Sequence, residues 1–307
     1  MRLTGEPDAT DPPLWAGMLE SSVEHAETIK GALSHDDAAE GQDHMQIHIV
    51  QDADAGATVV ADVFTRTLQE AGGTGAVLGL ATGSSPVPAY GELIRRHREE
   101  GLSFAGSRAF LLDEYVGLPA GHEQSYHRFI RENFTAHVDL DDAAVVSPDG
   151  GAADPVAEAA SYDRRIREAG GVDLQILGIG SNGHIAFNEP GSSLASRTRV
   201  VGLTRSTIED NARYFASASD VPVRAISQGL GTILDARRIV LTASGAGKAA
   251  AVAQLAEGAI SARWPATALQ MHPDVVVVVD EAAASQLELA EYYRYSRRLE
   301  IEHPLGA

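Results

Sequence analysis

The sequence predicts an α/β fold built on a mainly parallel sheet with helices on both faces. Short apolar runs alternate along the chain with longer segments whose apolar residues recur at helical spacing. Parallel strands need this order because a crossover segment, usually a helix, must join each pair. The run Val275 to Val279 contains only valine, which suits a strand buried on both faces. The chain has 307 residues, 44% of them apolar, so it can bury a sizeable core.

The first half of the pattern begins with residues 46–50, which read as a strand. Helical spacing follows over 56–71 and stops at Gly72 and Gly73, because glycine disfavours a continuing helix. The expected elements after this helix are a strand at 76–81, a turn at 82–86, a helix to about residue 100, a strand at 108–112 and helices at 125–136 and 155–169.

The second half opens with a strand at 172–178 that runs into a glycine-rich turn. Residues 188–222 are more polar and less regular. The expected elements beyond them are a strand at 224–227, a short helix near 230–234, a strand at 238–243, a helix over about 246–260 and a strand at 274–280. No repeat or linker divides residues 45–307, so we expect one domain there.

Residues 1–44 differ from the rest in charge, with ten acidic and two basic residues. Within them, residues 14–33 have apolar positions at helical spacing and could form one helix. We interpret 1–44 as a mostly flexible extension. The alternative is that Met45 is the true start.

Composition excludes several classes of protein. The formal charge of −19 repels nucleic acid and anionic lipid. No apolar run reaches the length of a membrane span, and no secretory signal opens the chain. The absence of cysteine excludes disulfides and thiolate zinc sites, and it fits a cytoplasmic protein.

Four polar turns follow predicted strands, at 82–86, 113–117, 180–189 and 244–248. Ligands of parallel α/β sheets bind outside the carboxyl ends of the strands. We therefore expect these turns to form one site.

The third turn carries the pattern G-x-G-x-x-G within GIGSNGHIAFNEP at 178–190. A dinucleotide site needs a helix after the last glycine, and Pro190 would break such a helix almost at once. The segment Gly245 to Lys248 resembles part of a phosphate-binding P-loop, but Thr242 and Ala249 depart from that pattern. We reject both nucleotide interpretations. A proton-transfer site is the better hypothesis for Asn182, His184 and Glu189, and an ordinary turn with a solvated histidine is the alternative.

Three segments, in chain order, resemble the glucosamine-6-phosphate deaminase family: LGLATGSSP at 78–86, LDEYVGL at 112–118 and GHIAFNEP at 183–190. Further matches are SSLASRTR at 192–199, GLGTILDA at 229–236 and ALQMHP at 268–273. The resemblance covers roughly residues 45–290 and leaves out 1–44.

The resemblance implies a single-domain, modified Rossmann-like fold with a mobile lid segment and no nucleotide. It implies that D-glucosamine 6-phosphate and water become D-fructose 6-phosphate and ammonia, as a step in N-acetylglucosamine catabolism. The family needs no metal or organic cofactor. The expected partner is a small sugar phosphate, and a homo-oligomer is possible because the family varies in this respect.

The resemblance also assigns catalytic roles. Asp113 matches the carboxylate that moves a proton from C2 to C1 of the open-chain sugar. His184 matches the group that assists ring opening, and Glu189 matches an acidic member of its hydrogen-bonded set. Asn182 stands where the best-studied members have Asp, so the set carries one negative charge fewer and favours the imidazolium less.

Binding roles follow from the same resemblance. The substrate phosphate is expected at Thr82, Gly83, Ser84 and Ser85, whose amides and hydroxyls precede a helix. Lys248 and Arg213 match phosphate-binding cations, with Arg213 on the mobile segment. A second pocket for the activator N-acetylglucosamine 6-phosphate matches Ser192, Ser193 and Arg199, although Val201 replaces a lysine of the family.

Three rival functions remain. A 6-phosphogluconolactonase shares the fold but needs no base at C2, and the Asp113 turn argues against it. A deaminase of galactosamine 6-phosphate would differ only at the C4 hydroxyl of its substrate. A sugar-phosphate sensor without activity would be expected to lose Asp113 or His184, and both are present.

Overall fold

The computed structural model describes residues 45–72, 75–118, 121–212, 215 and 217–303. At its centre is a seven-stranded sheet in which every pair of neighbouring strands is parallel. The strands in spatial order are β1 (Gln46–Val50), β10 (Val275–Asp280), β9 (Arg238–Ala243), β6 (Leu174–Leu177), β2 (Val77–Leu80), β3 (Arg108–Leu111) and β5 (Val145–Val146). The predicted α/β class with a mainly parallel sheet is confirmed.

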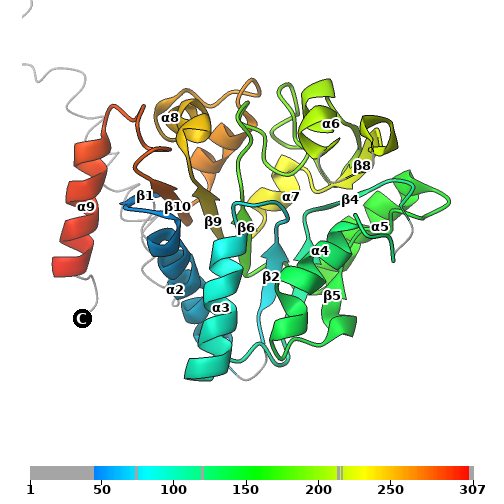
Figure 1. The fold of residues 1–307 in the computed structure, drawn as a ribbon, viewed down its shortest axis with the longest axis horizontal. Coiled ribbons are helices and arrows are strands. Elements are labelled where there is room, and N and C mark those ends of the chain that lie inside the picture. The colour runs from blue at the N-terminus through cyan, green and yellow to red at the C-terminus, as the bar shows by residue number, and fades with distance from the viewer. Residues whose placement is uncertain (1–44, 73–74, 119–120, 213–214, 216, 304–307) are drawn as a thin grey trace, which may run out of the picture. The chain divides into compact units, whose positions relative to one another are not determined.

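Helices lie between and beside these strands (Figure 1). They are α2 (Ala53–Ala71), α3 (Val87–Glu100), α4 (Tyr126–Asn133), α5 (Pro155–Glu168), α7 (Leu230–Leu234), α8 (Ala249–Glu257) and α9 (Ala290–Glu302). Every residue of β6 is buried, and so is β10 except for its last residue. Strands buried in this way are covered on both faces of the sheet.

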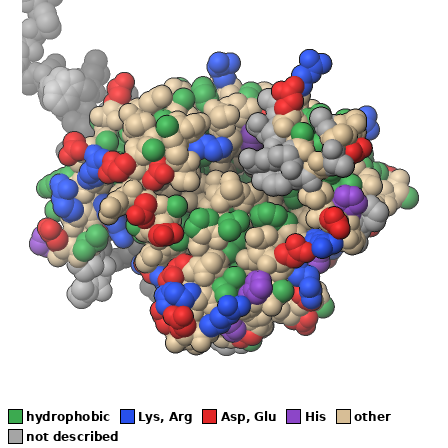
Figure 2. Space-filling model, in the orientation of Figure 1, with side chains coloured by type: hydrophobic (Ala, Val, Ile, Leu, Met, Phe, Trp, Pro, Cys, Tyr) green, Lys and Arg blue, Asp and Glu red, His purple; other side chains and the backbone are tan. Residues whose placement is uncertain are grey.

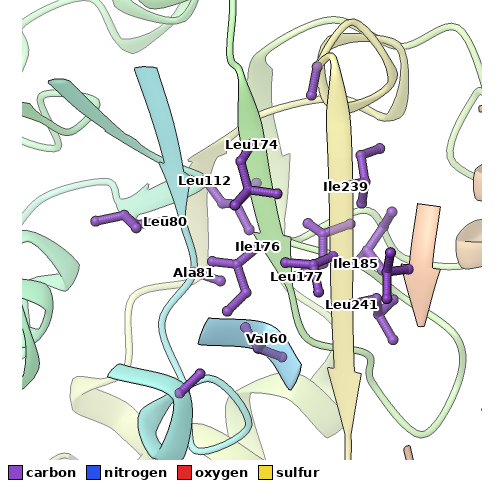
Figure 3. Close-up of a cluster of buried hydrophobic side chains, with 14 of the residues drawn as sticks. Val60, Leu80, Ala81, Leu112, Leu174, Ile176, Leu177, Ile185, Ile239 and Leu241 are labelled. Atoms are coloured by element: carbon purple, nitrogen blue, oxygen red, sulfur yellow. The ribbon is translucent and has the colours of Figure 1, made fainter. Parts of the chain in front are cut away.

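The core surrounds the central strands β2, β6 and β9. Leu80, Ile176 and Leu241 come from these three strands and are almost completely buried. Figure 3 shows them in one cluster with Ile185, which comes from the loop after β6. The polar loop expected to carry the chemistry is therefore anchored in the core by an apolar side chain.

A second, smaller sheet corrects two expectations. Its strands are β4 (Asp113–Tyr115), β8 (Arg224–Ser227) and β7 (Arg199–Gly202), and both pairs are antiparallel. The turn expected at 113–117 thus begins as a strand, because pairing with β8 satisfies its backbone groups. The less regular region 188–222 contains β7 and α6 (Arg205–Asn211).

Two helices near the carboxyl end also differ from expectation. The helix expected over 246–260 begins as a 3₁₀ turn at Ala246–Lys248 and continues as α8, which ends at Glu257 with Gly258 as its cap. Helix α9 was not predicted, since its sequence is rich in charged residues and tyrosine. It packs beside the edge strand β1 (Figure 1). The expected extension 1–44 lies outside the described residues.

Acidic and basic side chains are interspersed over the face drawn in Figure 2. Arg95, for example, forms ion pairs with three glutamates, Glu92, Glu99 and Glu100. Within the described ranges, no helix is both long enough and apolar enough to cross a membrane.

Gly79→Ala is expected to destabilise the fold. A Cβ at Gly79 in β2 would lie 2.0 Å from Oε1 of Gln175. Gln175 is buried in β6, and its amide donates to the Ile176 carbonyl at 2.8 Å, so it has little room to move. Overpacking of this kind costs about 1–3 kcal/mol, which urea unfolding would detect. Gly91→Ala is the control, because no atom lies within 4 Å of its new Cβ. Equal unfolding free energies for Gly79→Ala and the wild type would contradict the expectation.

Candidate active site

The loops expected to form one site leave the parallel sheet at the same edge. Loop 82–86 follows β2, loop 178–190 follows β6, and loop 244–248 follows β9. Strand β3 ends at Leu111, and a single residue separates it from β4. Because these strands are parallel, their carboxyl ends share one edge, where α/β sheets bind ligands.

Asp113 is the first residue of β4 and pairs with Ser227 of β8. Asp113 as a whole residue is 6% exposed. Burial raises the pKa of Asp113 to about 8, and the neighbouring charge of Glu114 adds to the shift. A carboxyl group with this pKa can take up and release a proton near neutral pH.

Ser227 and Gln228 join the Asp113 strand to the loop after β6. The Ser227 hydroxyl accepts from the Phe187 amide at 3.1 Å, and the Gln228 carbonyl accepts from Nδ2 of Asn188 at 2.8 Å. The backbone amide of Gln228 donates to the Leu112 carbonyl at 2.8 Å. Residues 112–113 and 187–188, distant along the chain, are thereby bonded to the same dipeptide.

His184, Asn182 and Glu189 form a connected hydrogen-bonded set. Nδ1 of His184 lies 2.7 Å from Oδ1 of Asn182, and Nδ2 of Asn182 donates to Oε2 of Glu189 at 2.8 Å. Nδ1 of His184 is 3.7 Å from the same carboxylate oxygen. The histidine side chain is 27% exposed and that of Glu189 12%, so the ring can meet a ligand while the carboxylate stays mostly covered.

These contacts assign the proton on the His184 ring. Oδ1 of Asn182 also accepts from the backbone amide of His184 at 3.1 Å, and its Nδ2 faces a carboxylate, which only accepts. The Asn182 oxygen is therefore an acceptor for Nδ1, which carries the proton in the neutral ring. Nε2 is then the basic nitrogen.

Two of the three glycines of the G-x-G-x-x-G pattern have local packing roles. A Cβ at Gly180 would lie 2.2 Å from Cε1 of the His184 ring, and one at Gly183, which has φ 82°, would lie 2.6 Å from Trp264. At Gly178 the nearest atom is Cβ of Ser85 at 3.5 Å, an ordinary contact. No helix follows Gly183 before Pro190, as the rejection of a dinucleotide loop predicted.

A tight turn fixes the loop between His184 and Glu189. Ala186 has φ 48°, the one positive φ of a non-glycine residue within the described ranges. The Asn188 backbone amide and Nδ2 both donate to the Ile185 carbonyl, at 3.1 and 3.0 Å. Because Ile185 and Asn188 are almost completely buried, the polar residues on either side are held by a rigid turn.

Loop 82–86 offers backbone amides to an anion. Gly83 has φ 93°, and a Cβ added there would have no atom within 4 Å, so the space beside it is open. The cap of α3 makes no side-chain hydrogen bond, so the first-turn amides of Val87 and Ala89 have no intrahelical acceptor. The Tyr90 hydroxyl bonds both the amide and the carbonyl of Ala81, at 3.1 and 2.7 Å, and fixes the start of the loop. Thr82, Ser84 and Ser85 supply hydroxyls there.

Lys248 ends the 3₁₀ turn after β9 and is half-buried. Ser244 of the same loop lines a pocket together with Ser85, so the two loops are neighbours. Asp280 holds this loop by accepting from the Gly245 amide at 2.9 and 3.0 Å and from the Ala283 amide at 2.7 Å. Arg213, the other cation expected at the phosphate, lies outside the described residues.

The structure brings together two of the three residues expected for an activator pocket. Arg199 donates to Oδ1 of Asn188 at 2.8 Å and to the Ser192 hydroxyl at 3.2 Å. The exposed Ser193 instead accepts from the Ala195 amide at 3.3 Å. Val201, at the place of the family's lysine, packs against an apolar cluster that includes Tyr115.

Sequence reasoning missed several residues that support this edge. Glu114, which had no expected role, accepts from the amides of Tyr115, Tyr126 and His127 at 2.9 to 3.1 Å and fixes the start of α4. Asp280 was expected only as the end of a strand, and Thr204 and Thr207, whose hydroxyls contact Glu189, were not among the expected site residues. The contacts of Glu114, Glu189 and Asp280 join residues whose spacing matches neither a helix nor a strand, so no local pattern marks them. An acidic residue at a strand end, such as Asp280, is a general signal for a loop contact.

The comparisons with known proteins agree with this geometry. A sequence model of the family "Glucosamine-6-phosphate isomerases/6-phosphogluconolactonase" matches residues 51–278. The glucosamine-6-phosphate deaminase of Rhodococcus opacus is 56% identical over 259 residues, which cover 84% of this chain and 97% of that protein. That of Corynebacterium aurimucosum is 60% identical over 223 residues, covering 73% of this chain and 88% of the relative.

Solved structures give the same fold. A monomeric glucosamine-6-phosphate deaminase matches with a TM-score of 0.76 and 43% identity, covering 79% of this chain and all of that one. The 6-phosphogluconolactonase of Trypanosoma cruzi matches with a TM-score of 0.64 and 19% identity, covering 80% and 98%. The second likeness concerns the fold alone.

Proposed function

The chain belongs to the family of glucosamine-6-phosphate isomerases and 6-phosphogluconolactonases, and we propose that it is a deaminase of that family. The reaction converts D-glucosamine 6-phosphate and water into D-fructose 6-phosphate and ammonia, in N-acetylglucosamine catabolism. The observation that carries this proposal is the buried carboxyl group of Asp113. The backbone strand of Asp113 is joined through the Ser227–Gln228 dipeptide to the loop that holds His184.

In this proposal Asp113 transfers the proton that the isomerisation moves. As a carboxylate it takes the proton from C2 of the open-chain sugar, and as a carboxyl group it returns the proton to C1. A pKa near 8 suits both steps, because neither the charged nor the neutral form is strongly favoured at neutral pH. Water then replaces the amine at C2, which leaves as ammonia.

His184 assists the opening of the pyranose ring by moving a proton between O5 and O1. With Nδ1 bonded to Asn182, Nε2 is the ring nitrogen that exchanges the proton. Glu189 orients this set through the Asn182 amide. The substrate phosphate binds to the 82–85 loop and to Lys248, with Arg213 as a further cation.

A coupled assay tests the reaction. Purified protein should release ammonia and fructose 6-phosphate in equal amounts from glucosamine 6-phosphate. Hydrolysis of 6-phosphogluconolactone instead would support the lactonase, and binding of the sugar phosphate without turnover would support a sensor. Running the assay on galactosamine 6-phosphate as well decides the preference at C4.

The value of kcat/KM should rise with pH up to a midpoint near 8. The reaction needs Asp113 ionised in the free enzyme, and its raised pKa keeps it protonated at lower pH. Well below the midpoint, the expected slope is about tenfold per pH unit. Titration of the Asp113 carboxyl by ¹³C NMR without substrate should give the same midpoint. A midpoint near the ordinary value of 3.8 would contradict this assignment.

Other expectations remain predictions. Activation by N-acetylglucosamine 6-phosphate through Ser192, Ser193 and Arg199 is tested by adding that sugar to the same assay. A homo-oligomer is not required, because every residue in this proposal comes from one chain. We expect the protein in the cytoplasm, where its phosphorylated substrate would be produced.

A further inference from the structure

Glu189 is held at both carboxylate oxygens. Oε2 accepts from Nδ2 of Asn182 at 2.8 Å. Oε1 accepts from the hydroxyls of Thr204, at 3.2 Å, and of Thr207. The two threonines belong to the start of α6, fifteen and eighteen residues farther along the chain, so this contact joins α6 to the loop of His184.

The hydroxyl protons of both threonines fit this arrangement. Thr204 caps α6, and its oxygen accepts from the Thr207 amide at 3.3 Å. An accepting hydroxyl still has its own proton to donate. Thr207 is 6% exposed, so water has little access to replace the bond it makes. An ionised carboxylate only accepts. The two hydroxyl oxygens also lie 2.9 Å apart, so Thr204 bonds Glu189 either directly or through the Thr207 hydroxyl.

We propose that Thr204 and Thr207 are positioning residues for His184, an inference that rests on the function proposed above. The two hydroxyls fix the rotation of the Glu189 carboxylate. Glu189 fixes the Asn182 amide, and the amide oxygen fixes Nδ1–H of His184. Without the hydroxyls, Glu189 can rotate and the Asn182 amide loses its fixed acceptor. The His184 ring then samples other orientations and both neutral tautomers.

The kinetic test uses the double variant Thr204→Val/Thr207→Val. We expect kcat to fall about tenfold to a hundredfold, because a misplaced catalytic group costs up to about 10²-fold. KM should change less than about twofold, since neither threonine is placed at the phosphate. Thr207→Val alone should show part of this loss, and Thr207→Ser should restore most of it.

Thr232→Val is the matched control. The Thr232 hydroxyl is buried and donates to a carboxylate oxygen of Asp163 at 2.7 Å, so its removal breaks the same kind of bond elsewhere. It should lower the unfolding free energy as the Thr207 variant does, and leave kcat unchanged. If Thr232→Val lowers kcat as strongly as Thr207→Val, the effect is structural and the proposal is wrong.

A second test, by NMR spectroscopy, needs no substrate. In protein with ¹⁵N-labelled histidine, the His184 signal, identified by its loss in His184→Gln, should show the Nδ1–H tautomer. The double variant should show a mixture of tautomers. Unchanged kcat together with an unchanged tautomer would overturn the proposal. If the wild type released no ammonia, the function would fail, while the tautomer comparison would still decide whether the threonines position the ring.

Discussion

Asp113→Asn is expected to lower kcat by about 10²- to 10⁴-fold, the contribution of a positioned acid–base group. The amide has nearly the shape of the carboxyl group but cannot take a proton from C2. Because Asp113 is buried as the first residue of β4, the neutral amide should keep the backbone pairing of that strand. The ammonia assay measures the loss of turnover, and binding of fructose 6-phosphate should persist.

Asp163→Asn is the control for a buried carboxylate outside the site. Asp163 is 5% exposed and binds Arg197 and the hydroxyls of Thr198 and Thr232. Its replacement should reduce the unfolding free energy, because it weakens a buried ion pair, and should preserve turnover. Full turnover by Asp113→Asn would remove Asp113 from the mechanism.

The same Asp113 variant should change how stability depends on pH. The pKa of Asp113 is about 8 in the folded protein, against an ordinary 3.8. Between these values the unfolded chain releases the proton and the folded protein keeps it, so the free energy of unfolding falls as pH rises. The wild type should therefore lose stability relative to the variant between pH 4 and 8, on the order of 1.4 kcal/mol per unit of pKa difference. Denaturation at several pH values measures this, and parallel curves would contradict it.

Gly180→Ala is expected to lower kcat by about 10²-fold through displacement of His184. The new Cβ would lie 2.2 Å from Cε1 of the ring. The His184 side chain is 27% exposed, so it can swing outward instead of disrupting the fold. Gly180 has no positive φ, and alanine fits its backbone. The free energy of unfolding should therefore change by less than about 1 kcal/mol.

Gly178→Ala is the control from the same glycine pattern. Its new Cβ would meet Cβ of Ser85 at 3.5 Å, an ordinary contact, so turnover should remain close to that of the wild type. Equal losses in the two variants would mean that the glycines serve the backbone of the loop and not the His184 ring.

The elements with strong local patterns were predicted closely. Strand β1 has the expected bounds of 46–50, and β10 differs from its expected range by one residue. The β10 run consists of consecutive valines that suit burial on both faces, and residues 46–50 alternate as a strand does, so few other assignments fit either segment. Helix α3 ends at residue 100 as expected, with Gly101 in a left-handed cap.

Elements that depend on distant partners were missed. Nothing within Asp113-Glu114-Tyr115 marks it as a strand, because β8, more than a hundred residues later, completes its hydrogen bonds. Helix α9 packs against β1, and its sequence is rich in charged residues. The hydrogen bonds from Thr204 and Thr207 at the start of α6 to Glu189 likewise join residues whose spacing along the chain matches neither a helix nor a strand.

By itself, the sequence determined the α/β class, the carboxyl-edge placement of the polar turns and the exclusion of a dinucleotide loop. Local periodicity and the backbone limits of glycine and proline act within a few residues, so they can be read directly from the chain. Only the tertiary structure decided the state of the chemical groups. These are the raised pKa of Asp113, the proton on Nδ1 of His184 and the hydrogen bonds that fix the Glu189 carboxylate. Desolvation and hydrogen bonding depend on which atoms surround a group, and those neighbours come from remote parts of the chain.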